Sequence, residues 1–252
     1  MLKFGKGNSK LGNHIATFSL LSGWSCPFAK DCMSKAHVDK ETGKKFLRDG
    51  KETKFRCFSA SQEVLYKNTY NARKHNFDLV KKESTENIVK LIKDSLPKKA
   101  TTVRIHVGGD FFNQKYFDAW LQVAKDIPNV LFYAYTKALP FWINKINEVP
   151  SNFKLNASKG GKRDDLIKEH NLKEAVVVYS EEQAKELGLE IDHDDTHAYK
   201  GDVSFALLIH GSQPKGSEAS NALKELKKEG WTGYTKKGRS KELESSNNKL
   251  GA

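Results

Sequence analysis

Short apolar runs separated by helical patterns recur along most of the chain. The runs lie at 15–21, 102–107, 130–135, 153–157, 175–179 and 204–209. Their length and their content of valine, isoleucine and aromatic residues predict buried strands. The intervening stretches carry apolar residues at helical spacing, as at Tyr116, Ala119, Trp120, Val123 and Ala124. This alternation predicts a single α/β domain with a mainly parallel sheet of about six strands, as a partial (β/α)6 TIM-like barrel.

The remaining pattern sets the limits of that domain. Helices are predicted near 62–82, 86–96, 141–149, 164–169, 180–188 and 217–229. Residues 38–54 form a polar excursion, which indicates a hairpin or a mobile loop. Residues 236–252 contain almost no large apolar side chain. We therefore expect one domain over 1–235 and a disordered basic tail after it.

Charge is distributed unevenly along the chain. The net charge is +12, and residues 1–100 hold 21 Lys and Arg against 10 Asp and Glu, a net +11. A concentrated positive field favours a nucleotide or nucleic acid as partner, and the alternative is a lysine-rich solvated surface. The apolar runs are too short to cross a membrane, and the first ten residues lack the apolar stretch of a signal peptide. The chain is therefore predicted to lie in the cytoplasm, that of the host cell for a phage-encoded protein.

Three cysteines, Cys26, Cys32 and Cys57, are the first candidates for chemistry. An odd number excludes a framework made only of disulfides and fits a reducing compartment. Three thiolates could hold zinc with a fourth ligand from elsewhere, or three irons of a [4Fe–4S] cluster. The alternative is three small buried apolar side chains. Cys26 and Cys32 lie in a polar stretch, which favours a metal site.

Polar side chains gather at the ends of the predicted strands, where parallel α/β proteins place their chemistry. They are His106, Gly108, Gly109, Asp110, Tyr135, Thr136, Lys137, Asn156, Ser158, Tyr179, Ser180, His210 and Gln213. Strand ends are commonly more polar than strand centres, so each residue alone carries little information. All six strand ends show the same tendency, and together they predict a site at this edge.

Two further stretches combine chemically active residues. Residues 192–197 contain two His and three Asp, which could bind a divalent metal or form an acidic surface loop. Residues 158–163, SKGGKR, form a flexible basic loop suited to phosphate contact. The spacing of a P-loop is absent from this loop.

Several segments together resemble the bacteriophage gene product 88 domain family from about Gly5 to Tyr234. They are GNSKLGNHIATFSLLSGWSCPFAKDC, RCFSASQEVLY, VRIHVGGDFFNQKYFDAW, FYAYTKALPFW, DDLIKEHNLKEAVVVYS, IDHDDTHA and FALLIHGSQPKGSEAS. The resemblance implies a phage protein.

The layout also distantly resembles the radical SAM enzymes, which are partial (β/α)6 barrels. This resemblance implies that Cys26, Cys32 and Cys57 bind a [4Fe–4S] cluster and that Gly108, Gly109 and Asp110 hold the amine of S-adenosylmethionine. It also implies that Asn156 and Ser158 meet the ribose. The chain departs from that pattern in three ways. Five and then twenty-four residues lie between successive cysteines, the aromatic Phe58 follows the last cysteine, and aspartate replaces glutamate.

Three functional hypotheses follow. The favoured one is an iron–sulfur enzyme of radical SAM type that acts on a nucleotide or nucleic acid. In it, the residues facing substrate are Lys137, Tyr135, His106 and His210, and the barrel mouth is rimmed by Lys35, Lys44, Lys45, Lys51, Lys54 and Arg56. The second is a zinc or manganese enzyme using Asp110, His193, Asp195 and His197. The third is a non-enzymatic nucleic-acid-binding phage protein stapled by zinc.

Overall fold

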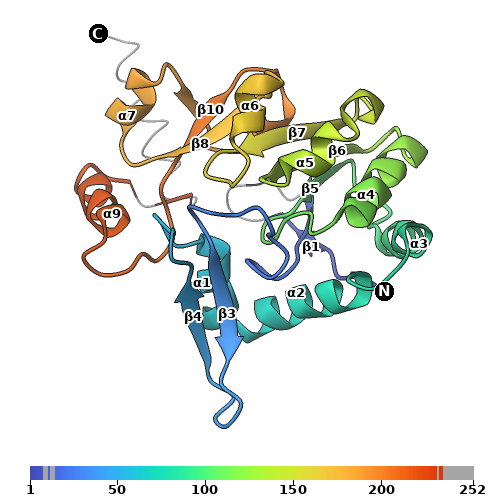
Figure 1. Ribbon diagram of the computed structural model, residues 1–252, viewed down its shortest axis with the longest axis horizontal. Coiled ribbons are helices and arrows are strands. Elements are labelled where there is room, and N and C mark those ends of the chain that lie inside the picture. The colour runs from blue at the N-terminus through green and yellow to red at the C-terminus, as the bar shows by residue number, and fades with distance from the viewer. Residues whose placement is uncertain (8–10, 12–14, 232, 235–252) are drawn as a thin grey trace.

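The computed structural model describes residues 1–7, 11, 15–231 and 233–234. Within them, an eight-stranded sheet has the order β1-β2-β5-β6-β7-β8-β10-β9, and helices pack against it (Figure 1). Within this eight-stranded sheet, all strand pairs are parallel except β1 with β2. The prediction of one α/β domain with a mainly parallel sheet is confirmed.

The six predicted strands form the centre of this sheet and follow one another in chain order. They are β2 (Ile15–Phe18), β5 (Thr102–Ile105), β6 (Leu131–Thr136), β7 (Phe153–Ser158), β8 (Glu174–Val178) and β10 (Phe205–Leu208). Sequential order is what repeated β–helix–β crossovers of one hand produce. It places the carboxyl ends of all six strands along one edge of the sheet.

The prediction of a TIM-like barrel is not met, since no closed barrel forms within the described residues. β1 (Gly5–Lys6) pairs with the outer edge of β2, and β9 (Glu190–Ile191) with the outer edge of β10. These two-residue strands occupy the edges that barrel closure would join. Closure requires the first and last strands to pair, and here each already has another neighbour.

Helices cover one face of the sheet because their apolar stripes match its apolar side chains. Against β2 to β7 the core contains Phe18, Ile105, Trp120, Phe132 and Phe153. A second cluster joins β8 and β10 to the helices near the carboxyl terminus. The covering helices are α3 (Thr85–Ser95), α4 (Gln114–Asp126), α5 (Leu139–Ile143), α6 (Asp165–Glu169), α7 (Glu181–Glu186) and α9 (Glu218–Lys228).

The opposite face of the sheet is covered by a short element that the sequence pattern does not predict. α8 (Thr196–Tyr199) packs on β6 and β7, with Ala198 buried beside Tyr133 and Phe205. A four-residue helix has too few positions to show a period. It packs on the face of the sheet that would line the interior of a barrel.

Two predicted helices are interrupted. The stretch 62–82 forms α1 (Phe58–Leu65) and α2 (Lys67–Val80), which are separated at Tyr66, whose ψ of 106° is not helical. The stretch 141–149 divides into α5 and the 3-10 helix η1 (Ile146–Glu148). The first break turns α2 relative to α1, and α1 can then pack on a hairpin.

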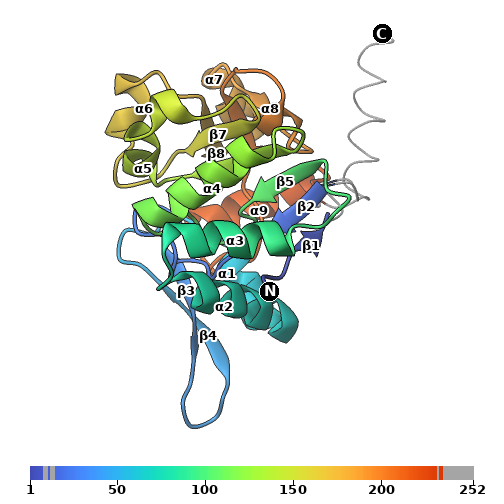
Figure 2. The same cartoon turned by 90° about the vertical axis from the view of Figure 1, so that its right-hand side faces the viewer.

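That hairpin occupies the polar excursion. β3 (Ser34–Val38) pairs antiparallel with β4 (Lys45–Asp49) and projects away from the main sheet (Figures 1 and 2). The expected tail, 236–252, lies outside the described residues. Of the helices in the described ranges, none has the length and apolarity that crossing a membrane requires.

Candidate functional site

The loop that carries Cys26 and Cys32 runs along the carboxyl edge of the sheet. It leaves β2 beside β5, where the amide of Leu20 donates to the carbonyl of Gly108 at 2.8 Å. Further on it pairs with the loop after β7, through a bridge between Ala29 and Gly161 and a 2.9 Å bond from the amide of Asp31 to the carbonyl of Gly160. The loop therefore spans the ends of β5, β6 and β7.

Cys57 reaches the same place from a different segment, as the residue before α1. Its amide donates to Ser34 Oγ at 3.2 Å, two residues after Cys32. Two positions further on, Ser59 Oγ and Ser22 Oγ lie 2.9 Å apart and share a hydrogen bond. The backbone on both sides of Cys57 is thus tied to the cysteine loop.

A buried ion pair fixes this junction. Glu63 of α1 accepts from the amide and hydroxyl of Ser22 at 2.9 and 2.8 Å, and from Arg73 of α2 at 3.1 Å. Arg73 also donates to the carbonyl of Ser59 at 2.9 Å. Burial raises the pKa of Glu63, while Arg73 and Ser22 lower it. A buried pair with such partners fixes geometry more than it adds stability.

The three thiols affect one another electrostatically. Burial raises the pKa of Cys26 well above its ordinary value, and Asp110, Cys57 and Cys32 raise it further. Burial likewise raises the pKa of Cys57 to about 11, with a further contribution from Cys32. Burial also raises the pKa of Cys32, against the opposing charge of Lys137. At neutral pH and without a cation, all three thiols are protonated.

Backbone N–H groups point at two of the sulfurs. Gly23 donates to Cys26 Sγ at 3.3 Å. The amides of Ala60 and Ser59, in the first turn of α1, lower the pKa of Cys57. Hydrogen bonds of this kind stabilise thiolates and tune cysteine-ligated metal centres.

The donor set suits a cysteine-ligated centre. However, no three His, Cys, Asp or Glu side chains in the described ranges are grouped so that they could hold a metal ion. The thiols are nevertheless near enough for Cys32 and Cys57 to raise the pKa of Cys26, and for Cys32 to raise that of Cys57.

Asp110 and Lys137 lie beside the thiols and are almost wholly buried. Asp110 accepts from Thr136 Oγ1 at 2.6 Å, from the amide of Phe111 at 2.7 Å and from the amide of Lys137 at 2.9 Å. Burial raises its pKa to about 6 against these hydrogen bonds. Lys137 Nζ donates to Ser158 Oγ and to the carbonyls of Ser158 and Lys159, at 2.7 to 2.9 Å.

These bonds do not fit the S-adenosylmethionine roles that the radical SAM resemblance implies. Both carboxylate oxygens of Asp110 already accept hydrogen bonds from the protein, and its side chain has no exposed path to an amine. Asn156 is fully buried and donates to the carbonyls of Ala134 and Ala198. We therefore assign no S-adenosylmethionine site.

The two glycines at the end of β5 are explained by packing. A Cβ at Gly108 would lie 2.0 Å from Ser59 Oγ. Gly109 has a φ of +90°, and a Cβ there would lie 3.0 Å from the carbonyl oxygen of Leu20. Only glycine allows the cysteine loop and α1 to approach β5 this closely.

Of the predicted substrate-facing residues, His106 is buried and Tyr135 is half-buried. His106 packs among Phe18, Phe111 and Tyr116, and its Nε2 shares a 2.8 Å hydrogen bond with Tyr116 Oη. Burial lowers its pKa to about 3, so the ring is neutral. Tyr135 donates to Asp195 at 3.1 Å beneath α8. Neither position supports contact with substrate, because core packing and α8 cover them.

The acidic stretch 192–197 belongs to the second face of the sheet and does not join Asp110. Asp195, fully buried, receives hydrogen bonds from Arg104 at 2.5 Å and from Tyr133 at 3.0 Å. His197 Nε2 lies 3.0 Å from Glu190, and its Nδ1 lies 3.5 Å from Asp192. The partners of Asp195 are structural, which does not support the His and Asp metal enzyme.

His210 stays at the carboxyl edge, after β10. Its ring packs against Phe58, next to Cys57, with centroids 4.6 Å apart and planes tilted by 40°. Gln213 lies beside the same segments, and its Oε1 accepts a 2.7 Å hydrogen bond from the amide of Arg56. The structure therefore places His210, unlike His106 and Tyr135, beside the thiol-bearing segments.

Of the basic residues predicted to rim the site, Lys35, Lys44 and Lys45 lie on the projecting hairpin, and Lys51, Lys54 and Arg56 follow it. Two of them are paired locally, Lys54 with Asp31 at 3.0 Å and Arg56 with Asp49 at 2.5 Å. Lys45 lies over the ring of Tyr70 on α2. The hairpin that carries Lys35 and Lys45 projects away from the main sheet (Figure 2).

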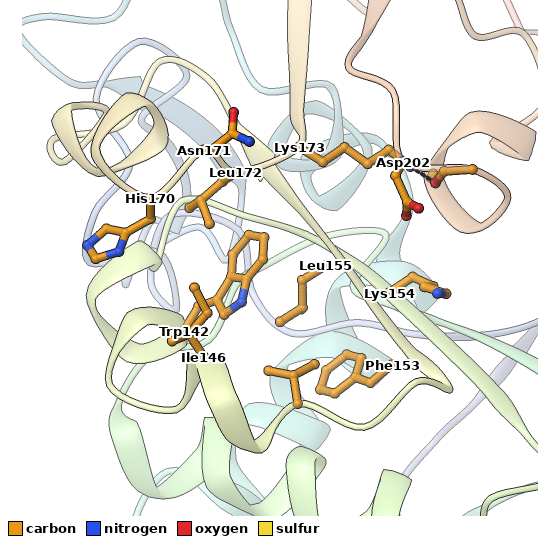
Figure 3. Close-up of a pocket in the computed structure, with 13 residues that line it drawn as sticks. Trp142, Ile146, Phe153, Lys154, Leu155, His170, Asn171, Leu172, Lys173 and Asp202 are labelled. Atoms are coloured by element: carbon orange, nitrogen blue, oxygen red, sulfur yellow. Dashed lines mark hydrogen bonds between the residues drawn. The ribbon is translucent and has the colours of Figure 1, made fainter.

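A cavity of about 330 Å³ lies at the opposite edge, at the amino ends of β7 and β8 (Figure 3). Trp142, Leu155 and Leu172 form its apolar part, and Lys154 and Lys173 line its other side. Parallel α/β proteins seldom use the amino edge for chemistry. None of the predicted site residues lines this cavity.

The sequence pattern did not identify Glu63 and Arg73, whose ion pair fixes the geometry of the site. It also did not identify the neighbouring rings of Trp24, His37 and Phe46. Glu63 and Arg73 lie ten residues apart on what the pattern shows as one polar helix. No local signal marks them as a pair. The alternation of Lys35, His37, Phe46 and Arg48 could have marked one face of a hairpin.

The fold and these placements define the class: an α/β protein with an open, mainly parallel sheet and three thiols gathered at its carboxyl edge. The chain belongs to the gene product 88 family, whose sequence model matches residues 2–228. The gene 88 proteins of Mycobacterium phages L5 and D29 are 32% and 33% identical to it over 90 residues. Each match covers 32% of this chain and 38% of the relative. No solved structure matches the chain.

Proposed function

We propose that Cys26, Cys32 and Cys57 ligate a metal centre at the carboxyl edge of the sheet, where the protein acts on a nucleotide or nucleic acid. The observation that carries this proposal is the convergence of two separate segments. Cys26 and Cys32 follow β2, Cys57 precedes α1, and hydrogen bonds through Ser34 and Ser22 bring them together.

An iron–sulfur cluster of the [4Fe–4S] type is the first choice for that centre. Three cysteines are its common protein ligand set when one iron is left for another ligand. When bound, such a cluster would supply one-electron chemistry.

The surrounding residues would prepare the site for an anionic ligand. Lys137 holds a buried positive charge next to Cys32, fixed by three oxygen acceptors. The amides of Gly23 and of the first turn of α1 stabilise thiolate sulfurs. The loop from Ser22 to Ser34 covers the edge and limits the access of water.

One observation favours a second candidate, a non-enzymatic nucleic-acid-binding phage protein stapled by zinc. Asp110 and Lys137 use their polar atoms within the protein, as structural residues do. In this alternative, zinc would hold the cysteine loop and α1 together. The two candidates share the three thiols and differ in the metal.

Anaerobic purification of the full chain, with iron, sulfide and zinc quantified per chain, separates them. Iron and sulfide in equal amounts support the cluster, and zinc alone supports the second candidate. Cys32→Ser and Cys57→Ser should each lose the metal. Met33→Leu is the matched control, because it removes a thioether from the same loop without removing a thiol.

A metal-free wild type from cultures supplied with iron and zinc would refute the thiol centre. So would full metal content in both cysteine variants. Circular dichroism of each variant shows whether a loss of metal reflects a loss of fold.

A further inference from the structure

The hairpin β3–β4 presents aromatic rings and cations on one of its faces. His37 pairs with Phe46 across the strands, and Lys35 pairs with Arg48. Residues two apart on a strand share a face, so these four side chains lie together. The rings of His37 and Phe46 stack with centroids 5.7 Å apart and planes 22° apart.

Trp24 of the cysteine loop extends this face. Its ring centroid lies 5.2 Å from that of His37, and its Nε1 donates to the carbonyl of Ala36 at 3.1 Å. Trp24 is 45% exposed, although large aromatic rings are usually buried. We call Trp24, His37 and Phe46, with Lys35 and Arg48, the aromatic face.

Both cations of the aromatic face lie against rings. Lys35 Nζ is 4.7 Å from the ring centroid of Trp24, and Arg48 Cζ is 5.2 Å from that of Phe46. Burial, together with Arg48 and Lys35, lowers the pKa of His37, so its ring is neutral at pH 7. The face therefore combines neutral rings with positive charges at its margin.

The back of the hairpin is already occupied. Ser34 and Ala36 are buried against the body of the protein, and α1 packs on both strands. Lys45 lies over Tyr70 of α2 at 5.1 Å. These contacts hold the hairpin in a fixed orientation and leave the aromatic face outward.

The acidic residues of this segment are mostly engaged in local contacts. Residues 34–56 contain eight Lys and Arg against four Asp and Glu, a net +4. Asp39 closes the turn by accepting from Thr42 and Glu41, and Asp49 pairs with Arg56. The charge that remains is complementary to a polyanion.

We propose that the aromatic face binds single-stranded nucleic acid, with bases stacked on Trp24, His37 and Phe46 and phosphates bound by Lys35 and Arg48. Every nucleobase has a flat face for a ring, and single strands expose those faces whereas duplexes hide them. Trp24 is two residues from Cys26, so a strand on this face would lead to the carboxyl edge. The inference rests on the proposed nucleic-acid substrate but not on the metal.

Binding of a labelled 20-nucleotide oligo-dT to the full chain, measured by fluorescence anisotropy over a range of salt, tests this inference. Phe46→Ala should weaken binding about tenfold with an unchanged salt slope, because stacking is not ionic. Lys35→Gln/Arg48→Gln should weaken it and reduce the slope by about 1.4, since each phosphate contact contributes about 0.7 on single strands.

Matched controls use similar side chains elsewhere. Tyr66→Ala removes a ring that is 59% exposed, and Lys98→Gln/Lys99→Gln removes two cations. Neither should change affinity by more than about twofold. Intrinsic fluorescence provides a second readout, because Trp24 is 45% exposed and the other three tryptophans at most 8%. Oligo-dT should quench the wild type and not Trp24→Phe.

The inference is overturned if the folded wild type does not bind oligo-dT at low salt, or if Phe46→Ala and Tyr66→Ala bind alike. Equal affinity for a duplex of the same length would also overturn it, because phosphate contact alone would then explain binding. Cys57→Ser separates the two proposals. If this variant is metal-free and still binds oligo-dT, the aromatic face stands without the metal.

Discussion

Two buried polar clusters lie on this sheet, and they differ in how their charges are compensated. On the second face, Asp195 accepts from Arg104, Tyr133 and Tyr135, so one carboxylate is paired with one guanidinium and two hydroxyls. At the carboxyl edge, burial makes each of three thiols harder to ionise, and neighbouring thiols add to this effect at Cys26 and Cys57.

The difference separates a structural cluster from a candidate binding site. A buried carboxylate with a full set of partners completes the fold. The negative charge on one thiolate disfavours ionisation of its neighbours. A bound cation offsets this repulsion, so the thiolate forms become favourable when a cation is present. The charge of Asp195 is thus compensated within the protein, whereas ionised thiols at the carboxyl edge would need a cation for compensation.

The sharpest test is the pH dependence of metal affinity. Burial holds the thiol pKa values high, that of Cys57 at about 11, so binding as thiolates must release protons. Each released proton raises the apparent affinity about tenfold per pH unit, or up to about a thousandfold for three. Titration of the metal-free protein with Zn²⁺ against a chelator, from pH 6.5 to 8.0, measures this change in apparent affinity. A flat profile would contradict thiolate ligation.

Asp195→Asn should lower the free energy of unfolding by about 3 to 5 kcal/mol, because the Arg104 guanidinium would stay buried without its counter-charge. Asparagine tolerates the φ of +66° at this position, so the backbone is little affected. Urea denaturation measures the loss. Asp165→Asn, which breaks the exposed pair with Arg163, is the control and should cost less than about 1 kcal/mol. Equal effects would refute the structural role of Asp195.

Zn²⁺ at a free concentration of one hundred times its dissociation constant should stabilise the protein by about 2.7 kcal/mol. Cys26→Ser should abolish that gain, and Asp195→Asn should keep it, although it starts from a lower stability. Chemical denaturation with and without Zn²⁺ measures both. If both variants lose the gain, the two clusters are not independent.

The smallest effect concerns Asp110 in the metal-free protein. Burial raises its folded pKa to about 6, above its usual value near 4, so the folded state binds the proton more tightly. Its contribution to stability therefore falls as pH rises from about 4 to 6, by on the order of 2 kcal/mol, and is constant above that. The difference in unfolding free energy between wild type and Asp110→Asn should follow this course. A difference independent of pH would show that the carboxyl is not buried.

The sequence pattern was sufficient for the parallel strands because each carries its own apolar run. β8, for example, is apolar throughout its centre, which is typical of a strand buried on both faces. Edge strands β1 and β9 have two residues each, and helix α8 has four, so none of them has a period to detect. These three elements keep the sheet open and cover its second face.

The candidate site was predictable in part. The residue types and strand-end positions of Cys26, Asp110 and Lys137 follow from the chain itself. The placement of Cys57 does not, because it depends on the break at Tyr66 and on the pairing of Glu63 with Arg73. His106 and Tyr135 looked equivalent to Lys137 in the sequence. Their side chains instead lie in the core and beneath α8.

The sequence by itself determined the order of strands and helices and the uneven charge, because these depend on neighbours along the chain. The gathering of the thiols and the buried partners of Asp110 and Asp195 were decided only by the tertiary structure, as was the outward row of rings on the hairpin. Each depends on contacts between residues far apart in sequence. A buried polar group costs free energy unless it has a hydrogen-bonding partner, and the packing of the chain determines which partner lies within reach.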